Sequence, residues 1–352
     1  MRKLASIQSI KEILPIEGAD RVELAKVLGW QCVVEKGKYT LGEKVIYCEV
    51  DSFLPVKEEF EFLRSSSFRK NTLLGEGFRV RTITLRGQLS QGLVLPLDLL
   101  PEGTDVSEGN DVTAVLGIKE WEVPEVAGNF GTIVGGLPEG FIPSDETRIQ
   151  SLPDILKEFA NVPYYITTKM DGTSCMCGVT KNKDGERKFH VTGHYTELKD
   201  DGKSAFYEYV KKKDIPSRLE NLVNSMGYGS LVIKGEWCGE GVQKNRLKLK
   251  TPEWYVFTVD IDGKRADLSQ MADICRKLDL KMVPIEEEGT NLAAMYKDTD
   301  ALILRSKGSY PNGGPKEGIV IRPRHTIYSE SLKGPLSFKV LNPKYLLKHE
   351  EE

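Results

Sequence analysis

Several features of membrane, secreted and zinc-binding proteins are missing from this sequence of 352 residues. No stretch reaches the roughly 18 apolar residues that a membrane-spanning helix needs. The N-terminal segment has basic residues but lacks the apolar block and cleavage site of a signal peptide. The six cysteines are scattered, and no second Cys/His pair stands at zinc-site spacing from Cys175 and Cys177. We therefore expect a soluble protein, cytoplasmic or otherwise intracellular, with reduced, buried thiols.

Two common nucleotide-binding signatures are also missing. The sequence contains neither a G-x-G-x-x-G fingerprint nor a G-x-x-x-x-G-K-[ST] phosphate loop. A net charge of −3 and a pI near 6.0 count weakly against a nucleic-acid binder, although affinity depends on local basic patches. With 39% hydrophobic residues the chain can bury real cores. At roughly 100–200 residues per domain, its length predicts two domains.

Residues 1–110 carry short apolar segments separated by turn residues. The expected strands include 22–27, 31–34, 44–50, 78–85 and 92–95. Several short strands in about 100 residues predict an all-β OB-type barrel, and such barrels often bind oligonucleotides. Arg79, Arg81 and Arg86 are candidates to follow a phosphate backbone, and a solvated strand face explains them nearly as well.

The rest of the chain has a different texture. Gly, Pro and acidic residues are frequent in 111–145, where we expect a linker or long loop. Residues 146–352 mix helices and strands without regular alternation, which predicts an α+β domain rather than a doubly wound sheet. The expected helices are 152–159, 204–213, 217–226 and 268–278. The expected strands are 164–169, 189–192, 231–236, 254–261 and 318–322.

Four charged residues stand at the edges of apolar strands in this second domain. They are Lys169 in K-M-D-G, Glu236 in G-E-W-C-G, Glu317 in K-E-G-I-V-I-R and Lys339 in S-F-K-V. A hydrophobic core requires the strands but not these charges, so the set indicates chemistry. A lysine amine attacks the α-phosphate of a nucleoside triphosphate only when neutral, and its reference pKa of ~10.4 disfavours that form at pH 7. A nearby metal ion or second lysine lowers the pKa, and carboxylates hold the metal.

This set of motifs resembles the covalent nucleotidyltransferase superfamily of ligases and capping enzymes. K-M-D-G is similar to motif I, G-E-W-C-G to motif III, E-G-I-V-I-R to motif IV and S-F-K-V to motif V. The resemblance covers about residues 140–350 and is strongest to ATP-dependent RNA ligases with an N-terminal OB module. The D-E-T-R-I-Q segment at 145–150 and G-E-G-V-Q-K-N at 239–245 are similar to segments of those enzymes. Because the chain ends soon after Lys339, we expect no C-terminal OB domain, which DNA ligases and capping enzymes usually carry.

The resemblance implies a fold and a reaction. The fold is an ATP-grasp-like α+β nucleotidyltransferase domain, with antiparallel sheets and flanking helices, preceded by the OB-type barrel. Lys169 is the implied nucleophile, which attacks ATP and carries the AMP. The AMP then passes to a 5′-phosphate, and a 3′-OH attacks that activated end and expels AMP. The implied partner is RNA, as a nicked duplex with 3′-OH and 5′-phosphate ends, sealed by a monomer in RNA repair.

The same resemblance implies the remaining site residues. The residues expected to contact the nucleotide or its metal are Arg148, Gln150, Asp171, Gly172, Glu236, Phe257, Glu317 and Lys339. Lys339 also has a catalytic role, because its charge stabilises the transferring phosphate. Asp171, Glu236 and Glu317 are expected to hold Mg²⁺ or Mn²⁺, partly through water molecules. Phe257 is expected to stack on adenine, although alternate residues of a central strand also pack a core.

The sequence departs from the family pattern at two positions. Ser337 stands where many relatives have the first lysine of motif V, and Lys333 or Lys344 is a possible substitute. His194 lies in the stretch where many RNA ligases carry an arginine, and it is either a terminal-phosphate contact or a surface residue.

The alternative functions are a DNA ligase, a GMP-transferring capping enzyme and an inactive nucleic-acid-binding protein of the same fold.

Overall fold

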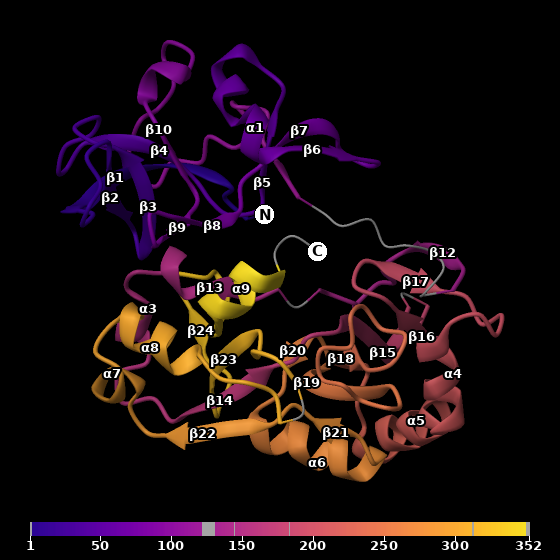
Figure 1. Ribbon diagram of the computed structural model, residues 1–352. Coiled ribbons are helices and arrows are strands. Elements are labelled where there is room, and N and C mark those ends of the chain that lie inside the picture. Colours follow the sequence, from indigo (N-terminus) through magenta and orange to yellow (C-terminus); the bar gives the residue numbers. More distant parts are fainter. Residues whose placement is uncertain (1, 122–130, 144, 183, 312, 350–352) are drawn as a thin grey trace. The chain divides into compact units, whose positions relative to one another are not determined.

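The computed structural model describes residues 2–121, 131–143, 145–182, 184–311 and 313–349 (Figure 1). The chain divides into two compact units. The first comprises residues 1–124, 150–153 and 346–352, and the second comprises 125–149 and 154–345. Within the expected linker 111–145, strands β11 (Lys119–Glu120) and β12 (Ile133–Gly136) pair with neighbours, while 122–130 and 144 lie outside the described residues.

The first unit is built of antiparallel strands. Its five-stranded sheet has the order β10 (Leu93–Leu95), β4 (Lys44–Cys48), β1 (Ala5–Pro15), β2 (Val22–Val27) and β3 (Trp30–Glu35). Its four-stranded sheet has the order β11, β5 (Ser52–Pro55), β7 (Gly75–Arg79) and β6 (Phe68–Asn71). Strands β8 (Thr82–Leu85) and β9 (Gln88–Gln91) form a hairpin. The short helices are η1 (Glu58–Leu63), α1 (Arg64–Ser67) and η2 (Leu97–Leu99).

The strand expected over 78–85 is wrong, because it is divided between β7 and β8. Val80 lies between them, and its N–H donates to the carbonyl of Ser52 at 2.9 Å. Its own carbonyl accepts from the N–H of Asp51 at 2.9 Å. These bonds hold the backbone at a corner between two sheets. Alternation of basic and apolar residues continues through such a corner, so the sequence pattern does not reveal it.

The phosphate-contact candidate Arg79 has partners within its own unit. Its Nη2 lies 3.0 Å from the Asp51 Oδ1, and its guanidinium lies 4.9 Å from the centre of the Trp121 ring. The ion pair and the ring contact give Arg79 a structural role at the sheet corner.

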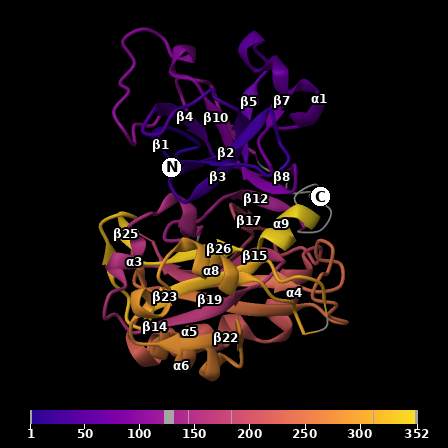
Figure 2. The same ribbon diagram turned by 60° about the vertical axis from the view of Figure 1, so that its left-hand side comes forward.

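The second unit contains two larger sheets. The first has the order β12, β17 (Thr196–Leu198), β16 (Arg187–Thr192), β15 (Thr173–Lys181), β18 (Leu231–Cys238), β19 (Glu253–Ile261) and β20 (Lys264–Arg265), with β21 (Lys281–Met282) beside β19. The second, visible in Figure 2, has the order β13 (Thr147–Arg148), β26 (Phe338–Leu341), β23 (Gly318–Pro323), β14 (Tyr164–Lys169) and β22 (Ile285–Gly289). Strands β24 (Tyr328–Ser329) and β25 (Gly334–Pro335) form a small pair.

Helices accompany these sheets. They are α3 (Ile155–Glu158), α4 (Ala205–Lys212), α5 (Ile215–Met226), α6 (Leu268–Leu278), α7 (Leu292–Met295) and α8 (Thr299–Ser306). The residues of η3 (Ile149–Ser151) and α9 (Pro343–His349) are divided between the two units. Helix α6 has the predicted bounds, and Asp267 and Gln270 form a capping box at its start. The helix expected over 152–159 is reduced to α3, since Pro153 disfavours helical backbone in the residue before it.

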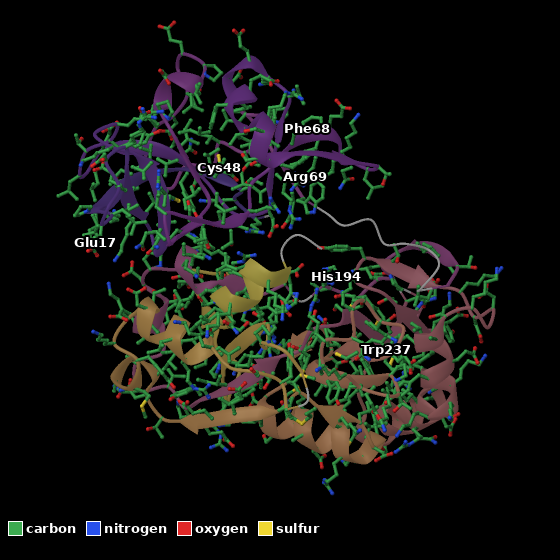
Figure 3. All side chains as sticks on the ribbon, in the orientation of Figure 1. Glu17, Cys48, Phe68, Arg69, His194 and Trp237 are labelled. Atoms are coloured by element: carbon green, nitrogen blue, oxygen red, sulfur yellow. The ribbon has the colours of Figure 1, made fainter. Side chains whose placement is uncertain are left out.

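The largest apolar core of the second unit lies between the first of its sheets and helices α4, α5 and α6. Trp237, labelled in Figure 3, contacts Phe206 and Tyr209 of α4 at ring-centre distances of 5.6 Å and 4.9 Å. All six cysteines are buried thiols that form no disulfide, as predicted, including Cys48 in the first unit (Figure 3). The predictions of an all-β first part and an α+β second part are confirmed. In the described ranges, no helix is long and apolar enough to cross a membrane.

Candidate active site

Strands β14 and β23 bring Lys169 and Glu317 together. Lys169 is the last residue of β14, and its Cα partner is Gly318, the first residue of β23. Glu317 directly precedes β23, so both side chains lie at the same end of this strand pair. The Lys169 Nζ is 2.7 Å from the Glu317 Oε1. Two residues 148 positions apart are thus neighbours because antiparallel pairing aligns the end of one strand with the start of the other.

Lys339 lies on β26, on the other side of β23. Its Cα partners are Val320 on β23 and Arg148 on β13. Burial lowers the pKa of Lys339, and the positive charges of Lys169 and Arg148 lower it further, to about 8. The arrangement gathers three positive side chains of the second unit, which suits the binding of a polyphosphate.

Glu236 comes from the other sheet of this unit. It lies on β18, where its Cα partner is Ser174 of β15. Burial raises the pKa of Glu236 to about 8, and the charges of Glu317 and Asp171 add to the rise while Lys169 opposes it. Burial lowers the pKa of Lys169, but the charges of Glu317 and Glu236 outweigh burial and raise it overall. The amine is therefore held protonated by its carboxylate neighbours.

A pocket in the second unit joins several of these residues. Its lining comprises Asp145, Glu146, Thr167, Thr168, Lys169, Met170, Ser174, His194, Glu236, Phe257, Val283, Val320, Arg322 and Lys339. Phe257 belongs to β19, and it packs with an apolar cluster that includes Met170 and Val283. A flat ring on an apolar pocket wall is suited to stacking on a nucleobase. The structure thus places Lys169, Glu236, Phe257 and Lys339 around one cavity.

Asp171 has different neighbours from those expected of a metal ligand. The Arg246 Nη1 donates to both of its carboxylate oxygens, at 2.8 and 3.1 Å. The Tyr345 hydroxyl donates to its Oδ1 at 3.0 Å. Because Asp171 is only 6% exposed, these two side chains, rather than water, are the partners of its carboxylate.

The carboxylates near Lys169 suit a hard divalent cation in charge and in donor type. Burial, with a smaller contribution from the charges of Glu317 and Asp171, raises the pKa of Glu236, and a bound cation would favour its charged form. However, within the described parts of the chain no three His, Cys, Asp or Glu side chains converge closely enough to hold a metal. A metal site made of Asp171, Glu236 and Glu317 therefore stays a prediction. Contacts to the metal through water molecules agree best with the positions of these side chains.

Gly172 has a packing role that the sequence did not reveal. A Cβ at this position would lie 2.3 Å from the carbonyl oxygen of Trp237 and 2.7 Å from the Cys238 Sγ. Its own carbonyl accepts a hydrogen bond from the Gln243 side chain. The glycine therefore permits a close approach between the start of β15 and the end of β18, which carries Glu236.

We expect Gly172→Ala to destabilise the second unit by about 1–3 kcal/mol, because backbone must move to admit the methyl group. Thermal unfolding followed by circular dichroism measures this effect. Gly136→Ala is the matched control, since a Cβ there would meet nothing within 4 Å. Unfolding of Gly172→Ala at the wild-type temperature would contradict the packing role.

The structure also gives the positions of Gln150, His194 and Lys333, which the sequence singled out. Gln150 is buried and belongs to the first unit, where its carbonyl accepts from the N–H of Gly29 at 2.9 Å. Its nucleotide contact stays a prediction. His194, labelled in Figure 3, lines the pocket, and its Nε2 lies 3.1 Å from the Asp145 Oδ2. Lys333 pairs with Glu330 at the surface, and neither Lys333 nor Lys344 lines the described pocket.

Glu146 has ion-pair and hydrogen-bond partners that no sequence motif predicts. The Arg322 Nη2 donates to its Oε1 at 2.7 Å, and Arg265 lies 3.7 Å from the same oxygen. The Ser337 hydroxyl donates to its Oε2 and accepts from the Arg265 Nη1. Ser337, which stands where many relatives have the first lysine of motif V, thus belongs to this ion-pair network. No local pattern signals the network, because Glu146 and Arg322 are 176 residues apart.

Glu286 connects the residues that precede the Lys169–Glu317 pair. Its carboxylate accepts from the Thr168 hydroxyl at 2.7 Å and from the Lys316 Nζ at 2.6 Å. Arg305 donates to the same carboxylate at 2.8 Å. The charged members of this network are absent from the pocket lining, and they brace the two strand ends.

Comparisons with known proteins agree with this geometry. A family model described as RNA ligase matches residues 162–341, which is half of the chain and includes Lys169, Glu236, Glu317 and Lys339. The chain belongs to the RNA ligase family. An OB-fold domain model matches residues 4–97 of this RNA ligase, which confirms the predicted barrel type. No match is found among curated proteins.

Solved structures of Naegleria gruberi RNA ligase resemble this RNA ligase over its whole length. An apo variant has 30% sequence identity and a TM-score of 0.87, with 100% of this chain and 99% of that chain covered. The complex with pyrophosphate has 29% identity and a TM-score of 0.87, with 100% of each chain covered. A variant with ATP and Mn has 30% identity and a TM-score of 0.86, with 99% of this chain and 100% of that chain covered.

Proposed function

We propose that this RNA ligase joins RNA 3′-OH and 5′-phosphate ends at the expense of ATP, through an AMP bound covalently to Lys169. The observation that carries the proposal is the position of Lys169, which lines a pocket together with Glu236, Phe257 and Lys339 and contacts Glu317 at 2.7 Å. The related Naegleria gruberi enzyme, solved with ATP and Mn, supports ATP and a divalent cation as the requirements. Monomeric action on nicked duplexes in RNA repair belongs to the same proposal.

In the first step, the Lys169 Nζ attacks the α-phosphorus of ATP. A phosphorus–nitrogen bond forms, the bond to the bridging oxygen breaks and pyrophosphate leaves. The proton of the attacking amine passes to solvent. Lys339 lines the same pocket as Lys169, and its positive charge would stabilise the phosphate oxygens. Glu236 and Glu317 would hold a divalent cation, whose positive charge would favour the neutral amine.

In the second step, an oxygen of the RNA 5′-phosphate attacks the AMP phosphorus, and the bond to Lys169 breaks. In the third step, the 3′-OH attacks the activated 5′-phosphate, and AMP leaves. Positive charge around the pocket, from Lys339 and Arg148 among others, suits the phosphate groups of all three steps.

Transfer of label from ATP tests the covalent step. The protein is incubated with Mg²⁺ or Mn²⁺ and ATP labelled at the α-phosphate, and then separated on a denaturing gel. Retained label is expected from α-labelled ATP and none from γ-labelled ATP, because the γ-phosphate leaves with pyrophosphate. The inactive-binder alternative predicts no label from either form.

A set of nicked duplexes tests the substrate. The four members carry RNA or DNA on each side of the nick, with a 3′-OH and a 5′-phosphate. The RNA-ligase proposal requires faster sealing when RNA supplies the 3′-OH. If the all-DNA nick is sealed equally well or better, the DNA-ligase alternative replaces it.

A further inference from the structure

A tyrosine hydroxyl connects the backbones of the two residues whose side chains meet in the pocket. The Tyr310 hydroxyl donates to the carbonyl oxygen of Lys169 at 2.8 Å. The same hydroxyl accepts from the backbone N–H of Glu317 at 3.1 Å. One oxygen atom therefore spans the end of β14 and the start of β23.

The ring of Tyr310 is anchored independently of those hydrogen bonds. The residue is 5% exposed, and it packs in an apolar cluster with Met170, Cys238, Leu247 and Val283. A buried aromatic ring has few alternative positions, because protein interiors are close-packed. The hydroxyl is thus held at a defined place by the core beneath the site.

The backbone of Glu317 is also held on its other side. Its carbonyl accepts from the N–H of Asn342 at 2.9 Å, and the Asn342 side chain donates to the carbonyl of Lys316 at 2.9 Å. Asn342 is fully buried. Tyr310 and Asn342 together satisfy both backbone groups of Glu317, so a shift of Glu317 would break buried hydrogen bonds on either side.

We propose that Tyr310 is a positioning residue, which sets the distance between the Lys169 and Glu317 backbones and thereby aims the Lys169 amine at the α-phosphate of ATP. The inference rests on the proposed function. Tyr310 does not line the pocket itself. Its effect passes through the Lys169 carbonyl, and small misplacement of a nucleophile has a large effect on rate.

Tyr310→Phe tests the inference, because it removes the hydroxyl and keeps the ring that fills the core. At saturating ATP, we expect the rate of AMP attachment to Lys169 to fall about 10- to 100-fold, with the KM for ATP changed less than about threefold. Sealing of a nick that already carries an adenylated 5′-end does not use Lys169 as the nucleophile. We expect that step to change less than about threefold.

Tyr296→Phe is the matched control. Its hydroxyl donates to the Glu287 Oε2 at 2.7 Å, so the substitution likewise removes a hydrogen-bonded tyrosine hydroxyl, but one outside the pocket lining. We expect wild-type rates in both assays. Thermal unfolding of both variants measures any general loss of structure.

The outcomes separate the inference from the function on which it rests. Absence of label on the wild-type protein overturns the proposed function, and the inference with it. Label on the wild type with an equal rate in Tyr310→Phe overturns the inference alone. An equal loss in AMP attachment and in sealing of the adenylated nick, or a matching loss in Tyr296→Phe, also overturns it, since that result describes a structural role.

Discussion

Lys169→Ala is expected to remove all detectable transfer of AMP to the protein, a loss of about 10⁴-fold or more, because the variant has no nucleophile at the end of β14. The only other lysine that lines the described pocket is Lys339, on β26 beyond β23. We do not expect it to replace Lys169, since productive attack requires the amine in line with the leaving pyrophosphate. The measurement is the denaturing-gel assay with α-labelled ATP.

Two further variants make this result specific. Lys169→Arg keeps a positive charge beside Glu317, but a guanidinium stays protonated and does not attack phosphorus, so it is also expected to be unlabelled. Lys181→Ala removes an exposed lysine from β15 of the same unit and is expected to label like the wild type. Label on Lys169→Ala at the wild-type rate would show that another residue carries the AMP.

Strands and helices with correctly predicted bounds are marked by sequence signals that lie within a few residues of one another. Strand β14 has its predicted bounds because a β-branched and aromatic run ends at a charged residue and a glycine turn. Helix α6 has its predicted bounds because a capping residue, an apolar period and basic residues in the last turn mark it locally. The corner at Val80 has no such local signal, since it depends on hydrogen bonds to Asp51 and Ser52.

The residues of the site divide in the same way, into those marked by a local motif and those brought in from distant parts of the sequence. Lys169, Glu236 and Lys339 were predicted because each stands in a short motif, and all three line one pocket. The partners that hold the site were not predicted. Arg246 is 75 residues from Asp171, and Tyr310 is 141 residues from Lys169. Contacts over such separations arise from tertiary packing, which the periodicity of a single sequence does not record.

Glu146 illustrates how much stability depends on one of these unpredicted contacts. Its side chain is 10% exposed and faces Arg322, whose side chain is 4% exposed. Glu146→Gln is expected to lower the free energy of unfolding of the second unit at pH 7 by roughly 3–5 kcal/mol, because it leaves buried guanidinium charge without its carboxylate. Glu139→Gln, at an exposed position of the same unit, is the control with little expected effect.

The pH dependence of this difference identifies the carboxylate as its source. Burial raises the pKa of Glu146, but the charges of Arg322 and Arg265 and the Ser337 hydrogen bond outweigh burial and lower it from 4.5 to about 2. A carboxyl whose pKa is depressed by folding stabilises the native state fully above its unfolded pKa, and that contribution is lost as the pH falls towards its folded pKa. The advantage of wild type over Glu146→Gln is therefore expected to be constant above about pH 5.5 and to shrink by up to about 1.4 kcal/mol per pH unit between about pH 4.5 and 2. Denaturant unfolding curves at a series of pH values measure it, and a difference that stays constant down to pH 2.5 would show that the Glu146 charge is not what stabilises the network.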